Sequence, residues 1–374
     1  LQEFTMKHTA KLALVAAALV TAALAQGVNP QAALKELATK VYSKGPSGEA
    51  PAPASSVTLT PAELAKVKAM NATAAIVLHY GGNDWSNAQV DGLKAQFAKL
   101  GIKVIAVTDA NFKPEKQVSD IETVLARKPS IIVSIPTDPV ATAAAYRKAA
   151  KAGVKLVFMD NVPSGLKAGT DYVSVVSADN YGNGVASAHL LAQQLGSKGN
   201  IGVIFHAADF FVTKQRYDAF KATIAKYPNI KIVAEQGIGG PDFAGDAEKV
   251  ASAMLTRNPN LNAIWAVWDV PAEGVMSAAR TAGRKDLVIA TMDLGKNVAL
   301  EMAKPNGMVR GLGAQRPYDA GVTEANLAAY GLLGKKAPPY VALNALPVTR
   351  ATLATAWKRV YNQTLPSDIQ SVLK

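Results

Sequence analysis

The feature that most constrains this chain is an alternation of short apolar runs with amphipathic helical stretches, which the sequence goes through twice. Between the first two runs, Val90, Leu93 and Phe97 fall at helical spacing. Strand–helix–strand units with right-handed crossovers build parallel, doubly wound sheets whose strands are buried on both faces. The sequence therefore predicts an α/β protein with two such lobes. The expected strands are 74–78, 102–107, 131–135, 154–159 and 172–176, then 201–205, 230–234, 263–267, 287–291 and 308–312.

Composition narrows the chemistry that two such lobes can carry. The chain has 374 residues and no cysteine, which excludes disulfides, thiolate nucleophiles and cysteine-ligated metals. Its four histidines, His8, His79, His189 and His206, stand apart, so we expect no metal site and no cofactor. The net charge of +12 comes from scattered lysines and arginines that form no basic patch or arm. A nucleic-acid partner is therefore not expected.

The first residues have the pattern of a secretory leader. Two lysines precede an apolar run from Leu12 to Leu24, which is too short to span a bilayer well, and small residues follow. We interpret residues 1–25 as a leader with a signal peptide at 6–25, cleaved after Ala25. Together with the absence of a cysteine for lipidation, this predicts release into the periplasm.

The stretch from 26 to 56 separates this leader from the first strand–helix series. It contains a segment that can form a short helix, followed by a Pro-, Ala- and Ser-rich run, and we interpret it as an N-terminal extension or linker. A helix is then expected to begin at Thr60, because Pro61 and Glu63 follow it in the spacing of a capping box.

Polar and aromatic side chains gather just past the predicted strands. In open parallel sheets, ligands bind at the carboxyl ends of the strands. Some Asp and Asn residues there only cap helices, but rings are scarce in this chain, so Trp85, Phe243 and Trp268 in loops indicate a binding surface. The polar and aromatic residues at the strand ends are Asn83, Asp84, Trp85, Asp109, Thr137, Asp138, Asp160, Asn161, Asp209, Phe210, Trp268, Asp269, Asp293 and Gln315.

Rings beside carboxylates and amides suit a sugar or polyol, because rings pack on C–H faces while polar groups bind hydroxyls. The same rings can form a box for an amine or other cation. Arg216, if it lines the site, counts against a cation and favours the polyhydroxy ligand. The sequence contains no Gly-rich dinucleotide fingerprint, no phosphate-binding loop and no serine nucleophile elbow. We therefore expect no catalytic residues and no enzymatic activity.

Several short motifs occur in a recognisable order between Ala74 and Val348. They are Pro136-Thr137-Asp138, Asp160, Ser177-Ala178-Asp179-Asn180, Arg216 four residues before Phe220, Pro241-Asp242-Phe243, Met292-Asp293 and Gln315. In this order and spacing the chain resembles periplasmic solute-binding proteins of the ribose-binding type, which deliver sugars to ABC importers. The resemblance implies the type I periplasmic binding fold, two lobes joined by a three-crossing hinge.

The resemblance also implies a set of ligand contacts. It places Asp160, Arg216, Phe243, Asp293 and Gln315 at ligand-binding positions, with Asp84 or Trp85 supplying the contact from the first loop.

Three departures from the ribose binders change the expected ligand. Trp268 stands where they have an Asn, Asn161 stands where they have an Arg, and the loop from Gly81 to Trp85 is one residue longer. Both substituted positions belong to the predicted site. Fewer hydrogen-bonding groups and more bulk predict a tetritol, a pentitol or a deoxy or modified sugar.

The resemblance further implies how the chain is divided. The first lobe is expected to comprise 57–178 plus 316–345, and the second 179–315 plus 346–374. We expect a monomeric solute-binding component that captures a small sugar or polyol between hinged lobes and delivers it to a membrane ABC permease. A binding protein for an amine or another non-sugar molecule, or the ligand-binding component of a chemoreceptor, remains as an alternative.

Overall fold

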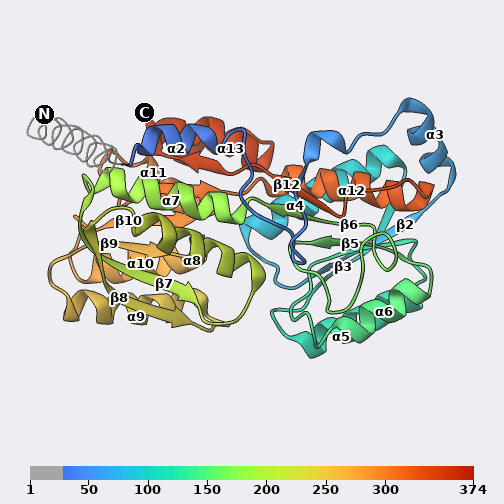
Figure 1. Ribbon diagram of the computed structural model, residues 1–374, viewed down its shortest axis with the longest axis horizontal. Coiled ribbons are helices and arrows are strands. Elements are labelled where there is room, and N and C mark those ends of the chain that lie inside the picture. Colours follow the sequence, from blue (N-terminus) through green and yellow to red (C-terminus); the bar gives the residue numbers. More distant parts are fainter. Residues whose placement is uncertain (1–27) are drawn as a thin grey trace, which may run out of the picture.

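Two separate β-sheets form the framework of the protein in the computed structural model, which describes residues 28–374. The predicted leader, 1–25, and the cleavage site after Ala25 lie outside the described residues. Figure 1 shows the two sheets side by side along the long axis of the molecule, each with helices on both faces. In the described part of the chain, no helix is both long and apolar enough to cross a membrane.

The first sheet has seven strands in the order β1-β12-β6-β5-β4-β2-β3. All of its neighbouring strands are parallel. Successive residues of β2 point to opposite faces, so Ile76 packs with helices α4 and α12 while Val77 packs with α5 and α6. Strand bounds are β1 Ala52–Pro53, β2 Thr73–Leu78, β3 Lys103–Asp109, β4 Ile131–Ser134, β5 Lys155–Met159, β6 Ser174–Ala178 and β12 Tyr340–Leu343. Helix bounds are α3 Pro61–Ala69, α4 Asp84–Leu100, α5 Pro114–Ala126, α6 Ala143–Lys151 and α12 Pro317–Leu333, with a 3-10 turn, η1, at Ala54–Ser56.

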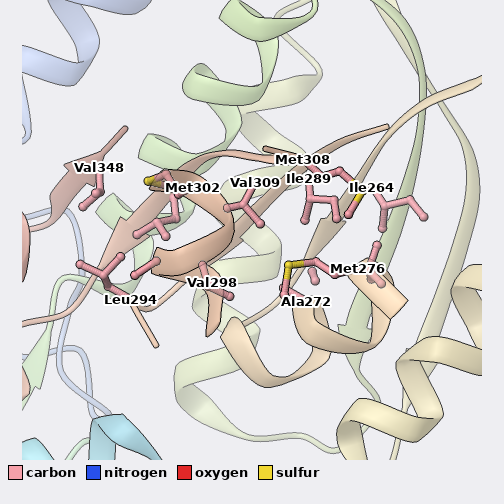
Figure 2. Packing of buried hydrophobic residues seen from close by; sticks show 14 of the residues in the cluster. Ile264, Ala272, Met276, Ile289, Leu294, Val298, Met302, Met308, Val309 and Val348 are labelled. Atoms are coloured by element: carbon pink, nitrogen blue, oxygen red, sulfur yellow. The ribbon is translucent and has the colours of Figure 1, made fainter. Parts of the chain in front are cut away.

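The second sheet has six strands in the order β13-β11-β10-β9-β7-β8, with only β13 antiparallel to its neighbour. Helices α7 and α8 cover one face, and α9, α10, α11 and α13 cover the other. Figure 2 shows this second core, where Met276, Met302 and Met308 fill the space between helices and strands. Strand bounds are β7 Lys198–His206, β8 Asn229–Ile238, β9 Leu261–Ala266, β10 Val288–Met292, β11 Val309–Ala314 and β13 Leu346–Val348. Helix bounds are α7 Asn180–Gln194, α8 Phe211–Ile224, α9 Phe243–Arg257, α10 Asp269–Thr281, α11 Lys296–Ala303, α13 Leu353–Tyr361 and α14 Ser367–Leu373, with a 3-10 turn, η2, at Arg350–Thr352.

This architecture confirms the predicted α/β class with two doubly wound, mostly parallel sheets. Each of the ten expected strands is present within a few residues of its predicted bounds, and α3 begins with the predicted capping box at Thr60. The expectation that all strands are buried on both faces is wrong for β3 and β8. Both lie at sheet edges, and Val107 and Val233 are each 42% exposed there.

The chain passes between the sheets at three places: from β6 to α7, from β11 to α12, and from β12 to β13. The last crossing is only two residues long, Asn344 and Ala345. Three parallel connections of this kind allow the sheets to rotate relative to each other, as in hinge-closing proteins.

Residues 28–56 contact both lobes, and we call this segment the strap. At its start, α2 (Pro30–Glu36) is capped by Asn29 and lies against α7 of the second lobe, and Leu37 is fully buried beside Ala186 and Ala345. At its end, β1 adds a parallel strand to β12 of the first lobe. In Figure 1 this blue segment runs from above the second lobe across to the first.

Candidate functional site

A small cavity lies between the two lobes, at the carboxyl ends of their strands. Its lining from the first lobe includes Tyr80 and Asp160, and from the second Arg216 and Asp293. The volume is ≈ 70 Å³. This volume is several times the roughly 10–15 Å³ that a single water requires, so the cavity has space for a small ligand.

One carboxylate from each lobe reaches the cavity, and the two residues have the same backbone conformation. Asp160 follows β5 and Asp293 follows β10, and both have left-handed φ angles of 55° and 63°. Each donates its N–H to a carbonyl of the neighbouring strand, Asp160 to Val176 and Asp293 to Gly313. Asp tolerates this conformation better than most side chains, and such strain is typical of functional positions.

Asp293 is the centre of a buried polar network. Arg216 Nη1 lies 2.9 Å from Asp293 Oδ2, and Gln315 Nε2 donates to Asp293 Oδ1 at 3.1 Å. The guanidinium also donates to Asn180 Oδ1 and to the carbonyl of Val267. These bonds compensate the desolvation of the ion pair and hold the guanidinium in one orientation.

Asp160 is 3% exposed and accepts a short hydrogen bond from Ser177 Oγ. Burial raises its pKa to about 6, although Ser177 and the nearby Arg216 act in the opposite direction. Its second oxygen has no protein hydrogen bond in the described chain, so it is available to a ligand hydroxyl.

Aromatic rings form most of the remaining wall. Tyr80 and Phe112 are stacked with ring centroids 4.9 Å apart, and Trp268 meets Phe243 edge-on at 4.9 Å. The lining rings are His79, Tyr80, Trp85, Phe112, His206, Phe210 and Trp268. Both histidines are neutral near pH 7, because burial lowers the pKa of His79 to about 3 and that of His206 to about 4.

Six of the nine residues predicted from the sequence line this cavity: Trp85, Asp160, Arg216, Trp268, Asp293 and Gln315. The other three lie beside it. Asn161 donates to the carbonyl of Pro136, and the ring of Phe243 packs against Trp268 and, across the lobes, against Phe112. Asp84 accepts the backbone N–H of Lys296, at 2.6 Å, and so connects α4 of the first lobe to α11 of the second.

Several lining residues were not among the predicted site residues. His79 and Tyr80 directly follow β2, and His206 is the last residue of β7, so the rule of strand ends would have found them if every ring had been counted. Asp269 was noted at a strand end but was not assigned a role. In the described chain, no group of three or more acidic or histidine side chains is arranged to hold a metal ion.

The fold and this site define a two-lobed binding protein that encloses a small molecule between lobes joined by a hinge. The chain belongs to the family of periplasmic binding protein domains, whose model matches residues 74–336. The predicted resemblance to periplasmic solute-binding proteins is thereby confirmed.

Curated relatives and solved structures agree with this membership. The chain is 27% identical to the D-apiose import binding protein of Actinobacillus succinogenes, covering 71% of this chain and 84% of that protein. It is 26% identical to the ribose import binding protein of Salmonella typhimurium, covering 71% and 86%. A solute-binding protein of an ABC transporter from Agrobacterium vitis with bound allitol superposes with a TM-score of 0.68 at 25% identity, covering 77% of this chain and 98% of that one.

Proposed function

We propose that this protein is the periplasmic solute-binding component of an ABC importer and that its ligand is a small sugar or polyol. The observation that carries the proposal is the cavity between the lobes, to which both lobes contribute carboxylates and rings. Asp160, Arg216, Asp293 and Gln315 supply hydrogen bonds for hydroxyl groups, while Trp85 and Trp268 supply flat faces for C–H groups. The relatives named above import D-apiose and ribose, and a similar structure binds allitol.

Capture follows from the division of the contacts between the lobes. We take the moving bodies to be 57–178 with 316–345 and 179–315 with 346–374, connected by the three crossings. A ligand that touches Asp160 on one body and Arg216 on the other binds the closed form more tightly than the open form, and that difference drives closure. The permease then distinguishes the closed protein from the open one.

In this proposal, residues 6–25 are a signal peptide that directs the chain to the periplasm. The proposal assigns no catalytic step, because the chain belongs to a family of binding protein domains. A chemoreceptor ligand-binding component would share this site and differ in its membrane partner.

The test is a thermal-shift screen of the purified mature protein against sugars, polyols, amines and amino acids, followed by calorimetry on each positive. A ligand that binds only the folded state raises the melting temperature. Asp160→Ala and Asp293→Ala should each abolish binding with the fold intact, whereas Asp218→Ala, an exposed carboxylate on α8, should leave binding unchanged. Tight binding that survives both cavity substitutions contradicts the site, and ligand recovered chemically altered contradicts a pure binding role.

A further inference from the structure

Asp269 is a cavity carboxylate that has no partner of opposite charge. It begins α10, lines the cavity and is 8% exposed. Oδ1 accepts the N–H of the adjacent Val270 at 2.9 Å, while Oδ2 has no hydrogen bond within residues 28–374. Gly295 leaves space for this oxygen, because a Cβ at position 295 would collide with it.

The charged groups that act on Asp269 are all acidic. They are Asp293 at the end of β10, Glu273 on α10 and Asp84 on α4. Burial, followed by these three carboxylates, raises the pKa of Asp269 well above its usual value. The other titratable groups coupled to it are the phenols of Tyr80 and Tyr361, which bring no positive charge at neutral pH.

Arg216 does not compensate for this excess of negative charge. Its guanidinium is already bound by Asp293, Asn180 and the carbonyl of Val267. Among the lining residues in the described chain, three carboxylates therefore face one guanidinium that is held by one of the three. The two lining histidines remain neutral, as shown above, and add no positive charge.

The rings next to Asp269 suit a cation as well as a sugar face. Trp268 precedes Asp269 directly, lines the cavity, and meets His206 and Phe243 in T-shaped arrangements. Tyr80, whose phenol is close enough to be affected by Asp269, lies in the opposite lobe. A carboxylate among aromatic rings, shielded from water, is the environment that binds ammonium groups most strongly.

We propose that the ligand carries an ammonium group in addition to its hydroxyls and that Asp269 binds this group, so that the ligand is an amino sugar or amino polyol. The inference rests on the proposed function, since hydroxyl recognition remains with Asp160, Arg216, Asp293 and Gln315. Arg216 would count against a cationic ligand only if its charge were free, and Asp293 neutralises it.

The test compares ligand pairs that differ only in one group, by calorimetry on the mature full-length protein. Suitable pairs are glucosamine with glucose, 2-amino-2-deoxyribose with ribose, and 1-amino-1-deoxyribitol with ribitol. The amino member of at least one pair should bind at least tenfold more tightly than its hydroxyl partner. N-acetylglucosamine, which lacks the charge, should show no such gain.

Asp269→Asn keeps the shape of the side chain and removes its charge. It should cost the amino ligand at least tenfold in affinity and change binding of the neutral partner by less than threefold, with the melting temperature as the check on folding. Asp218→Asn, on the exposed side of α8, is the matched control and should change neither.

The outcomes separate this inference from the proposed function. If neutral sugars or polyols bind and no amino counterpart binds more tightly, the ammonium site is refuted while the sugar-binding function stands. If Asp269→Asn lowers the affinity for both members of a pair equally, the ammonium site is also refuted, because Asp269 then contacts a hydroxyl that both ligands share. If no member of any pair binds, the proposed function fails and the inference fails with it.

Discussion

By its resemblance to the ribose binders, this cavity is expected to depart most from their pattern at Trp268. Its ring lies between Phe243 and His206, so it fills space that an amide would leave open. Asn161, the other substituted position, turns its amide to the carbonyl of Pro136 and does not line the cavity. We therefore expect selectivity at this end of the cavity to depend on the indole of Trp268.

Replacing Trp268 by Asn should shift the ligand profile towards ribose-like sugars. The substitution opens the cavity and supplies an amide for an additional hydroxyl, so affinity for the native ligand should fall by about tenfold or more while ribose gains. Trp357→Phe, a buried ring on α13 away from the cavity, serves as a control for general loss of packing. An unchanged profile in Trp268→Asn would mean that the indole only packs.

A second residue-scale feature is the buried pair Glu324 and Gln89. Gln89 Nε2 donates to Glu324 Oε1, while Glu324 Oε2 and Gln89 Oε1 have no partner. Burial raises the pKa of Glu324 well above its usual value. Burial therefore favours the protonated, uncharged form of this carboxyl in the folded protein.

Glu324→Gln should stabilise the protein at neutral and alkaline pH. A raised pKa in the folded state means that the stability supplied by Glu324 is full below about pH 4.5 and is lost as pH rises through the folded value, by up to about 1.4 kcal/mol per unit. The glutamine side chain is uncharged at every pH. In urea denaturation, the free energy of unfolding of Glu324→Gln should therefore exceed that of the wild type by ~1 kcal/mol or more at pH 8 and by almost nothing at pH 4. Glu122→Gln, on the exposed face of α5, should show no gain at either pH. If the free energies of unfolding of wild type and Glu324→Gln changed with pH in parallel, the raised pKa of Glu324 would be contradicted.

At the scale of elements, the strap was the part that sequence reasoning described least well. Its Pro- and Ala-rich composition is typical of a linker, yet it is bound at both ends and in the middle. Ser43 donates its N–H and its hydroxyl to Asp179 Oδ1, each at 2.8 Å, and Tyr42 donates its N–H to Oδ2 at 3.0 Å. Asp179 caps α7 at the first crossing, so the strap contacts the hinge itself.

Truncating the strap's buried anchor should therefore destabilise the whole protein. Leu37→Ala should cost about 2–5 kcal/mol in the free energy of unfolding, because a fully buried Leu leaves a cavity. Leu34→Ala, in α2 just before Leu37 but only partly buried, should cost less than half as much. Equal melting curves for Leu37→Ala and wild type would show that the strap is peripheral.

Strands and helices with a clear hydrophobic periodicity were predictable from the sequence, and very short elements were not. The ten predicted strands are marked by continuous apolar runs. The polar and aromatic residues noted at the ends of these runs include eight of the lining residues, whereas Arg216, inside α8, was indicated only by the resemblance. β1, β12 and β13 are two to four residues long, contain or follow prolines and lack a helix of their own, so no periodicity marks them. A position just past a strand can be read from the sequence, but the direction of its side chain cannot. For this reason Asp84, Asn161 and Phe243 were predicted to line the cavity and instead lie beside it.

For the whole molecule, Asp84 provides a hydrogen bond that connects the two lobes, from α4 to the start of α11. Asp84→Ala removes the bond to Lys296 N without removing a cavity wall, so it should favour the open form. We expect affinity to fall about tenfold, corresponding to roughly 1–1.5 kcal/mol, mainly through faster dissociation. Asp91→Ala, two turns along the same helix and exposed, is the control for stopped-flow measurements. A slower association with unchanged dissociation would argue against a closing contact.

The three crossings also set the order in which the protein can be completed during synthesis. The first sheet lacks β12 until residue 343 has been made, and β1 has no partner before then, because it pairs with β12 alone. The second sheet likewise waits for β13 at 346–348. Neither sheet has all of its strands until the ribosome has synthesised about nine tenths of the chain. The nascent protein therefore stays incompletely folded until the last tenth of the chain emerges.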